Sequence, residues 1–302
     1  MSLKSSLRPA SPWLLAVLLG CFFSPCLRGD DEKKSAPVKT AEDRLREAVT
    51  AFRQGRQEEA LNTVGQVIAS HPDYAQAYFV RGQILAGLNE HAKAIAEYDH
   101  ALSLDPSAYP VYQPRGCEHF MLGHIEKSLA DFDQYLKLNP SQAPYHWQRG
   151  ISLYYAGRFD DGRKQFELHQ TVNPADVENA VWHFLCTARQ SGIEQARKTL
   201  TPIARDSRVP TMQVHALFAQ KLKPEDVLAA ARANDPSPEQ LKQQLFYAHL
   251  YLGLYYEALG DAKLTREYIG LAAAKSTAYG YMGAVARVHA EILGRKDAKP
   301  AK

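Results

Sequence analysis

The sequence has few of the residues that usually mark a metal site or a reactive thiol. It contains four cysteines, and two of them lie within the first 26 residues. Cys117 and Cys186 stand alone in predicted helices, where a buried unpaired thiol is commoner than a disulfide. No CxxC or HExxH motif occurs, and His119 and His124 are five residues apart, the wrong interval for one helix face. We therefore expect no metal and no cofactor.

Motifs of nucleophilic catalysis are also missing from the sequence. There is no GxSxG, no phosphate-binding glycine loop, and no Ser or Cys beside an evident base. An alternative hypothesis is a hydrolase with its active site in the segment 177–240. The only candidate catalytic residues there are His183, His215 and Glu225. We expect no catalytic residue and no enzyme.

Neither charge sign is in excess, because 36 Lys and Arg stand against 33 Asp and Glu, and no run of lysines occurs. A nucleic-acid partner is therefore not expected. The longest apolar stretch, residues 13–23, is too short to span a bilayer, which needs ~20 residues. Since Lys4 and Arg8 precede this stretch, it has the pattern of a secretory signal.

Residues 18–21, LLGC, look like a bacterial lipobox, in which cleavage exposes a cysteine that is then acylated. This predicts a signal peptide at 1–20, lipidation of Cys21 and a flexible tether at 21–40. Phe22, rather than Asp, follows the cysteine and favours the outer membrane, facing the periplasm. The alternative is ordinary cleavage before Asp30, which would give a soluble periplasmic or secreted protein. Cleavage before Cys21 would leave 34 basic and 33 acidic side chains.

Two residue types recur at an interval of 34 residues. They are the glycines Gly82, Gly116 and Gly150, and the prolines Pro72, Pro106, Pro140 and Pro174. Such a coincidence indicates an internal repeat. The predicted repeats are 41–74, 75–108, 109–142 and 143–176.

Each repeat is predicted to be a helix hairpin. Position 15 holds Gly55, Asn89, Gly123 or Gly157, residues that suit the left-handed conformation closing a helix, and the proline at position 32 ends the second helix. A glycine inside a helix costs about 1 kcal/mol relative to alanine, so the recurrent one at position 8 needs close helix packing as compensation. The bulky residue at position 24, such as Phe166, is predicted to fill the gap to the next hairpin.

These positions resemble the tetratricopeptide repeat (TPR), which has Gly or Ala at position 8, Ala at position 20 and Pro at position 32. The resemblance implies an all-α, right-handed superhelical solenoid of helix hairpins with a C-terminal capping helix. TPR domains that grip acidic peptide tails carry Lys and Asn at groove positions five and nine, and this sequence does not.

Beyond residue 176 the glycines and prolines no longer recur every 34 residues. Four shorter helices are predicted there, at 178–192, 193–206, 211–222 and 223–235. Gly253 and Gly260 restore the repeat spacing, which predicts a TPR-like hairpin and a capping helix over 241–295 and a polar tail at 296–302. This order is similar to the NlpI family of outer-membrane TPR lipoproteins. The resemblance implies an adaptor that holds peptidoglycan hydrolases, presents one to a periplasmic protease, and forms a homodimer.

In a TPR array, positions 5, 9, 12 and 13 of each first helix face the concave groove. The predicted protein-binding groove is formed by Phe79, Gln83, Gln113, Phe120, Met121, Trp147, Ile151, Tyr154 and Tyr155. It would take an apolar segment of a partner protein, although some of the aromatics could instead belong to the core. The function predicted is a cell-envelope adaptor, membrane-bound through its N-terminal lipid. An outer-membrane assembly factor, such as a secretin pilotin, is the alternative of the same class.

Overall fold

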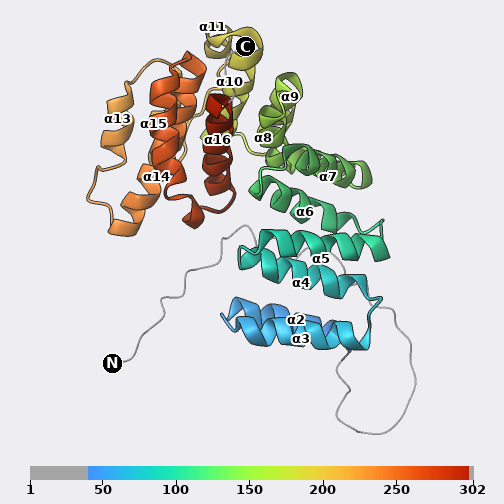
Figure 1. Ribbon diagram of the computed structural model, residues 1–302. Coiled ribbons are helices and arrows are strands. Elements are labelled where there is room, and N and C mark those ends of the chain that lie inside the picture. The colour runs from blue at the N-terminus through green and yellow to red at the C-terminus, as the bar shows by residue number, and fades with distance from the viewer. Residues whose placement is uncertain (1–39, 299–302) are drawn as a thin grey trace, which may run out of the picture. The chain divides into compact units, whose positions relative to one another are not determined.

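The structure is a computed structural model that describes residues 40–298 (Figure 1). These residues form helices joined by turns and short coils, and no strand occurs among them. Within the same residues, no helix is both long enough and apolar enough to cross a membrane. The chain divides into two compact units after Glu118, a point inside the helix α6 (Tyr109–Met121).

The first unit consists of helix hairpins, each within one predicted repeat. Its helices before α6 are α2 (Ala41–Arg53), α3 (Gln57–Ser70), α4 (Ala75–Gly87) and α5 (His91–Leu104). A capping box begins α2, because Thr40 Oγ1 accepts from the Asp43 backbone N–H and the Asp43 carboxylate accepts from the Thr40 backbone N–H. The prediction of left-handed residues at the hairpin turns is confirmed by φ angles of 79° at Gly55 and 61° at Asn89.

The second unit continues with hairpins and adds shorter helices. Its elements after α6 are α7 (Ile125–Leu138), η1 (Pro140–Tyr145), α8 (Trp147–Tyr155), α9 (Phe159–Gln170), α10 (Val177–Ser191), α11 (Ile193–Lys198), α12 (Thr211–Phe218), α13 (Pro224–Ala230), α14 (Pro238–Leu259), α15 (Ala262–Ala273), η2 (Ser276–Ala278) and α16 (Gly280–Ala298). The α14–α15 hairpin is the expected return of the repeat, and α16 packs against α15.

Several element boundaries differ from the sequence predictions. The helices predicted over 211–222 and 223–235 end at Phe218 and Ala230. The helix predicted over 193–206 ends at Lys198, since Pro202 disfavours helical backbone at the residue before it. The hairpin predicted from 241 begins at Pro238, where Ser237 and Gln240 form a capping box. The polar tail predicted from residue 296 is helical as far as Ala298.

The glycines at position 8 lie under bulky side chains of their own hairpins. A Cβ added at Gly82 would lie 2.5 Å from Tyr98 Cε1, and one added at Gly150 would lie 2.6 Å from Phe166 Cζ. The position-24 side chain therefore packs over the glycine of the same hairpin. It also reaches the next hairpin, as predicted, because the Phe132 ring lies 4.5 Å from that of His146 and the Phe166 ring lies 6.4 Å from that of Trp182. Gly253 lies equally close to Ile269 Cγ1, at 2.6 Å.

The recurrent prolines lie at the ends of the second helices. The Pro72 and Pro106 carbonyls accept hydrogen bonds from Tyr78 and Tyr112 Oη at 2.9 and 3.0 Å. Pro140 opens η1, and the Pro174 carbonyl accepts from Gln170 Nε2 at 2.9 Å. Proline thus follows each second helix, and at Pro72, Pro106 and Pro174 a side chain hydrogen-bonds the proline carbonyl.

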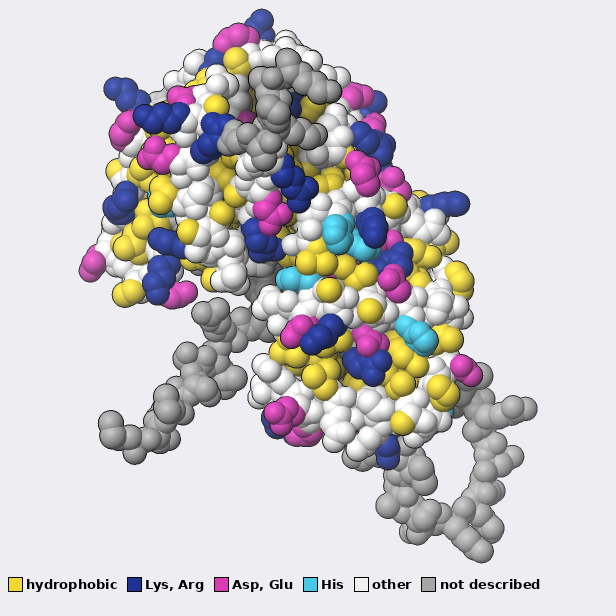
Figure 2. Space-filling view, viewed as in Figure 1, with side chains coloured by type: hydrophobic (Ala, Val, Ile, Leu, Met, Phe, Trp, Pro, Cys, Tyr) yellow, Lys and Arg dark blue, Asp and Glu magenta, His cyan; other side chains and the backbone are white. Residues whose placement is uncertain are grey.

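The surface carries both charge signs in close pairs. Arg149 Nε donates to Asp133 Oδ1 at 2.7 Å, and Arg81 Nη2 donates to Glu97 Oε2 at 2.8 Å. On the face shown in Figure 2, basic and acidic side chains are interspersed, with hydrophobic ones between them. That face therefore presents no field of one sign.

Candidate functional site: the inner face of the second unit

The C-terminal helix α16 lies against the aromatic residues that were predicted to line the groove of the second unit. The Tyr281 ring stacks on Phe120, with centroids 4.7 Å apart and planes at 17°. The same ring meets Trp147 edge-on at 5.2 Å. One aromatic side chain of α16 thus contacts both α6 and α8.

Polar groups tie the same elements together around Glu257 of α14. Tyr154 Oη of α8 donates to Glu257 Oε2 at 2.7 Å, and Arg189 Nη1 of α10 donates to Oε1 at 3.4 Å. His289 Nε2 of α16 lies 3.7 Å from Oε1, and His289 Nδ1 is hydrogen-bonded to Tyr155 Oη at 3.0 Å. One carboxylate therefore joins four helices. Burial, and then the nearby Glu257 carboxylate, raises the pKa of Tyr154 well above its ordinary value.

Helix α16 belongs to the core of the second unit, because residues on nearly all its sides are buried. Its buried side chains include Tyr281, Met282, Val285, Val288 and His289. The polar residues Glu291 and Arg295 near its C-terminal end are exposed, but removing the helix would expose the buried side chains to water. The inner face of this unit is closed by the chain itself.

This arrangement corrects the predicted groove. Phe120 and Ile151 are fully buried and Tyr154 is 4% exposed, so none of them lines an open surface. In the first unit, Phe79 and Gln83 are buried as well, and the Phe79 ring lies 6.0 Å from that of Tyr98. The groove prediction is wrong for these five side chains.

The other four predicted groove residues keep part of their surface exposed. They are Gln113, Met121, Trp147 and Tyr155. Met121 accepts a hydrogen bond at its carbonyl from Arg287 Nη2 of α16 at 2.8 Å. Gln113 belongs to the first unit, and Met121, Trp147 and Tyr155 belong to the second.

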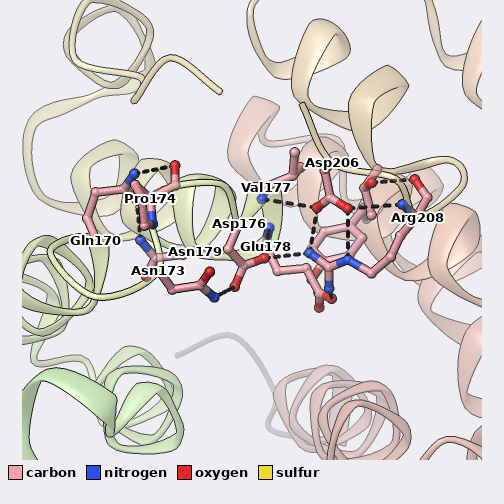
Figure 3. A network of polar contacts seen from close by, with 11 residues as sticks. Gln170, Asn173, Pro174, Asp176, Val177, Glu178, Asn179, Asp206 and Arg208 are labelled. Atoms are coloured by element: carbon pink, nitrogen blue, oxygen red, sulfur yellow. Dashed lines mark hydrogen bonds and ion pairs between the residues drawn. The ribbon is translucent and has the colours of Figure 1, made fainter. Parts of the chain in front are cut away.

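A second polar cluster, which the sequence did not reveal, surrounds Arg208 in the coil between α11 and α12 (Figure 3). Its Nη2 atom contacts Asp176 Oδ1 at 2.6 Å and Asp206 Oδ2 at 2.5 Å, and its Nη1 donates to Glu178. Tyr251 Oη of α14 donates to Glu178 Oε2 at 2.5 Å. One guanidinium thus faces three carboxylates and fastens this coil to the start of α10.

Burial acts differently on the carboxyl groups of this cluster. Burial raises the pKa of Glu178, although Arg208 and Tyr251 oppose the rise. Burial also tends to raise the pKa of Asp206, but hydrogen bonds from Arg208 outweigh it and hold that pKa below its ordinary value. The contacts join residues 30 and 32 positions apart, so no local spacing could have indicated them.

The residues considered for a hydrolase site have separate structural partners. His183 Nε2 lies 3.3 Å from Glu167 Oε1 in a cleft of about 300 Å³ between α9, α10 and α11. His215 Nε2 contacts the Thr201 carbonyl at 2.8 Å, and Glu225 is exposed in the first turn of α13. Burial lowers the pKa of His183 and raises that of the Cys186 thiol. A buried thiol of this kind is a poor nucleophile.

The predicted lipidation site Cys21 and the tether lie outside the described residues. Helix hairpins that follow one another and pack through small residues define a helical-repeat protein, the class of the α-helical solenoids. The tetratricopeptide repeat family model matches residues 45–109. Residues 45–109 therefore match the tetratricopeptide repeat, a helical repeat that generally serves as a scaffold for protein interaction.

Several solved structures are similar to parts of this chain at low sequence identity. MamA 41-end from Desulfovibrio magneticus RS-1 has 15% identity and a TM-score of 0.48, covering 65% of this chain and 97% of that one. PilW, described as a widely conserved type IV pilus biogenesis factor, has 17% identity and a TM-score of 0.48, covering 76% and 90%. The first TPR of Spaghetti (RPAP3), bound to the HSP90 peptide SRMEEVD, has 24% identity and a TM-score of 0.32, covering 33% and 79%.

Proposed function

We propose that this protein is a non-enzymatic adaptor of the bacterial cell envelope that binds partner proteins through its repeats. The observation that carries the proposal is the succession of tetratricopeptide hairpins, a scaffold for protein interaction. The signal-like N-terminus and the LLGC sequence support localisation at the outer membrane, with a lipid on Cys21. The resemblance to the NlpI family makes peptidoglycan hydrolases and a periplasmic protease the candidate partners.

The partner would contact the edge of the closed inner face. Trp147 is partly exposed and packs edge-on against Tyr281, and a side chain that is already packed loses less freedom when a partner covers it. Tryptophan is also among the residues that most often dominate binding energy. Met121 of α6 and Tyr155 of α8 are also partly exposed in this unit.

Site-specific photocrosslinking tests this function. A photoreactive phenylalanine analogue replaces Trp147 in the full chain, and the control carries it at Leu138, which is 40% exposed at the end of α7. We expect the Trp147 position to capture a defined envelope protein that the Leu138 position does not. A hydrolase or protease would support an adaptor, whereas a pore subunit would indicate an assembly factor. Equal capture from both positions, with intact helicity, would remove Trp147 from the interface.

Mass spectrometry of the mature N-terminus tests the proposed membrane anchor independently of the crosslinking. A diacylated or triacylated peptide beginning at Cys21 is expected, and Cys21→Ser should abolish the acyl mass. A peptide beginning near Asp30 would exclude the membrane anchor while leaving the adaptor role open.

A further inference from the structure

The α14–α15 hairpin has an aromatic surface that the rest of the described chain leaves partly open. The rings of Tyr256 on α14 and Tyr268 on α15 are stacked, with centroids 5.6 Å apart and planes at 9°. Both tyrosines are partly exposed, whereas Tyr255 beside them is buried. The two rings therefore lie on the side of α14 that faces away from the core.

Two exposed leucines extend this surface along the same helices. Leu259 follows Tyr256 by three residues and Leu271 follows Tyr268 by three residues, so each lies on the face of its tyrosine. Both leucines are 44% exposed. We call these four side chains the tyrosine face. Neighbouring exposed apolar and aromatic side chains of this kind are typical of interaction sites.

The charged groups that act on the two phenols are carboxylates. Burial raises the pKa of Tyr268, and Glu267 and Glu225 raise it further. Burial also raises the pKa of Tyr256, with contributions from Glu225 and Asp261. Glu225 acts on both rings because it stands in the first turn of α13, which packs against α14 (Figure 1). The tyrosine face is thus bordered by negative charge.

The group beneath the rings adds no opposing charge. His249 lies 6.1 Å from Tyr268 between ring centroids and is 8% exposed. Burial, followed by the charges of Lys275 and Arg232, lowers the pKa of His249, so its imidazole is neutral at neutral pH. The His249 imidazole therefore adds no positive charge. Lys275 and Arg232 act on His249, whereas the charges that act on the Tyr268 phenol are those of Glu267 and Glu225.

We propose that the tyrosine face, together with Glu225, is a docking site for arginine side chains of a basic segment on a partner protein. A planar guanidinium stacks on an aromatic face and pairs with a carboxylate, and its methylene stem can lie along the leucines. The inference deepens the proposed adaptor role, on which its biological meaning rests, by naming a second surface and the chemistry of its partner.

Other occupants fit this surface less well. A purely apolar helix would take Glu225 and Glu267 out of water without a partner for either charge, which is costly. A second copy related by a two-fold axis would bring the same acidic border against itself, and like charges repel. An arginine-bearing segment satisfies both the rings and the carboxylates.

The test titrates the purified full chain, carrying ring-labelled tyrosine, with a short capped peptide of alternating glycine and arginine. Ring resonances are assigned with Tyr256→Phe and Tyr268→Phe, and binding is followed by nuclear magnetic resonance. We expect both rings to shift with saturation. Glu225→Gln should weaken binding roughly two- to five-fold and Tyr268→Ala should weaken it more. Raised salt should also weaken it.

Matched controls decide the outcome. In the control peptide citrulline, a neutral isostere, replaces arginine, and the control variant is Tyr145→Ala, which removes a tyrosine that is 58% exposed elsewhere in the unit. Equal binding of the citrulline peptide, no saturable shift, or equal loss in Tyr145→Ala and Tyr268→Ala would overturn the proposal. So would concentration-dependent dimerisation through this face.

Two further comparisons keep the result interpretable. If Tyr268→Ala loses helicity, the affinities of Glu225→Gln and Tyr145→Ala are compared instead, and equal affinities would overturn the proposal. Suppose that crosslinking at Trp147 captures a partner protein but the tyrosine face does not bind the arginine peptide. This result would contradict the present inference alone and would leave the proposed adaptor function unaffected.

Discussion

The Tyr155 phenol and the His289 imidazole are hydrogen-bonded at 3.0 Å, although 134 positions separate them in the chain. The contact joins α8, a repeat helix, to α16, the last helix of the chain. His289 is 2% exposed, whereas Tyr155 keeps part of its surface exposed, so the contact runs from the surface of the unit into its interior. A first helix that would face an open groove in a simple repeat array here packs on the C-terminal helix.

Replacing Tyr281 by Ala should destabilise the second unit strongly. The change removes a ring that contacts both Phe120 and Trp147, and aromatic-to-alanine changes in cores cost about 3 kcal/mol or more. Urea unfolding followed by circular dichroism measures the free energy. Tyr281→Phe keeps the ring and should cost less than about 1 kcal/mol. If Tyr281→Ala lowers the free energy of unfolding by less than about 1 kcal/mol, α16 is only loosely packed against α6 and α8.

The hairpins could be predicted from the sequence because their signals are local and repeated. Gly55 and Asn89 close helices with positive φ, and the prolines stop the second helices. The location of α16 could not be predicted in this way. Its packing on Phe120 and Trp147 depends on contacts between segments that are far apart in the sequence. The position of a residue within a repeat indicates only whether its side chain points inward. Inward-pointing aromatics serve a groove or a core equally well.

Two glycines in helices should respond oppositely to alanine. Gly150→Ala places a Cβ 2.6 Å from Phe166 Cζ, so we expect a loss of roughly 1–3 kcal/mol from overpacking. Gly65→Ala in α3 meets nothing within 4 Å, so its better helix propensity should add up to about 1 kcal/mol. Thermal and urea unfolding of both variants give the comparison. If both stabilise the protein, Phe166 can move away and glycine is not required at position 150.

Arg208→Ala should destabilise the coil before α12 and its junction with α10. It leaves Glu178, Asp176 and Asp206 facing one another without a cation. Because the Arg208 side chain is 48% exposed, solvent screens part of the loss, and we expect about 1–3 kcal/mol. Arg208→Lys should recover only part, since an ammonium cannot bridge three carboxylates as a guanidinium does. Arg46→Ala, which breaks an exposed pair in α2, is the control and should change little.

The Arg208 cluster shows why only part of the polar framework could be predicted from the sequence. The periodic pattern over residues 193–206 predicts one helix, which places Asp206 on a helix face rather than in a coil that folds back on α10. Once Pro202 ends the helical stretch, Asp206 and Arg208 reach Asp176 and Val177. An error in one boundary therefore concealed the whole cluster of charged residues.

Stability should fall as the pH drops from the ordinary histidine range, partly because of His146. Burial, and then Arg149, lowers the pKa of this imidazole from 6.5 to about 3. Between these values the unfolded chain binds a proton that the folded chain does not, so acid favours unfolding by about 1.4 kcal/mol per pH unit for this one group. The contribution is fully present above pH 6.5 and is lost towards pH 3.

Two variants isolate this effect. His146→Asn keeps an acceptor for the Arg149 backbone N–H, whereas His146→Phe keeps an aromatic ring against Phe132. Both variants remove the titrating group. In both, the slope of the unfolding free energy against pH should therefore fall between about pH 4 and pH 6 by an amount that corresponds to about one proton, whatever the absolute stability of the variant. Urea unfolding at several pH values measures that slope. A slope equal to that of the wild-type protein in both variants would show that His146 is protonated in the folded state, and that the packing around it opens to admit the charge.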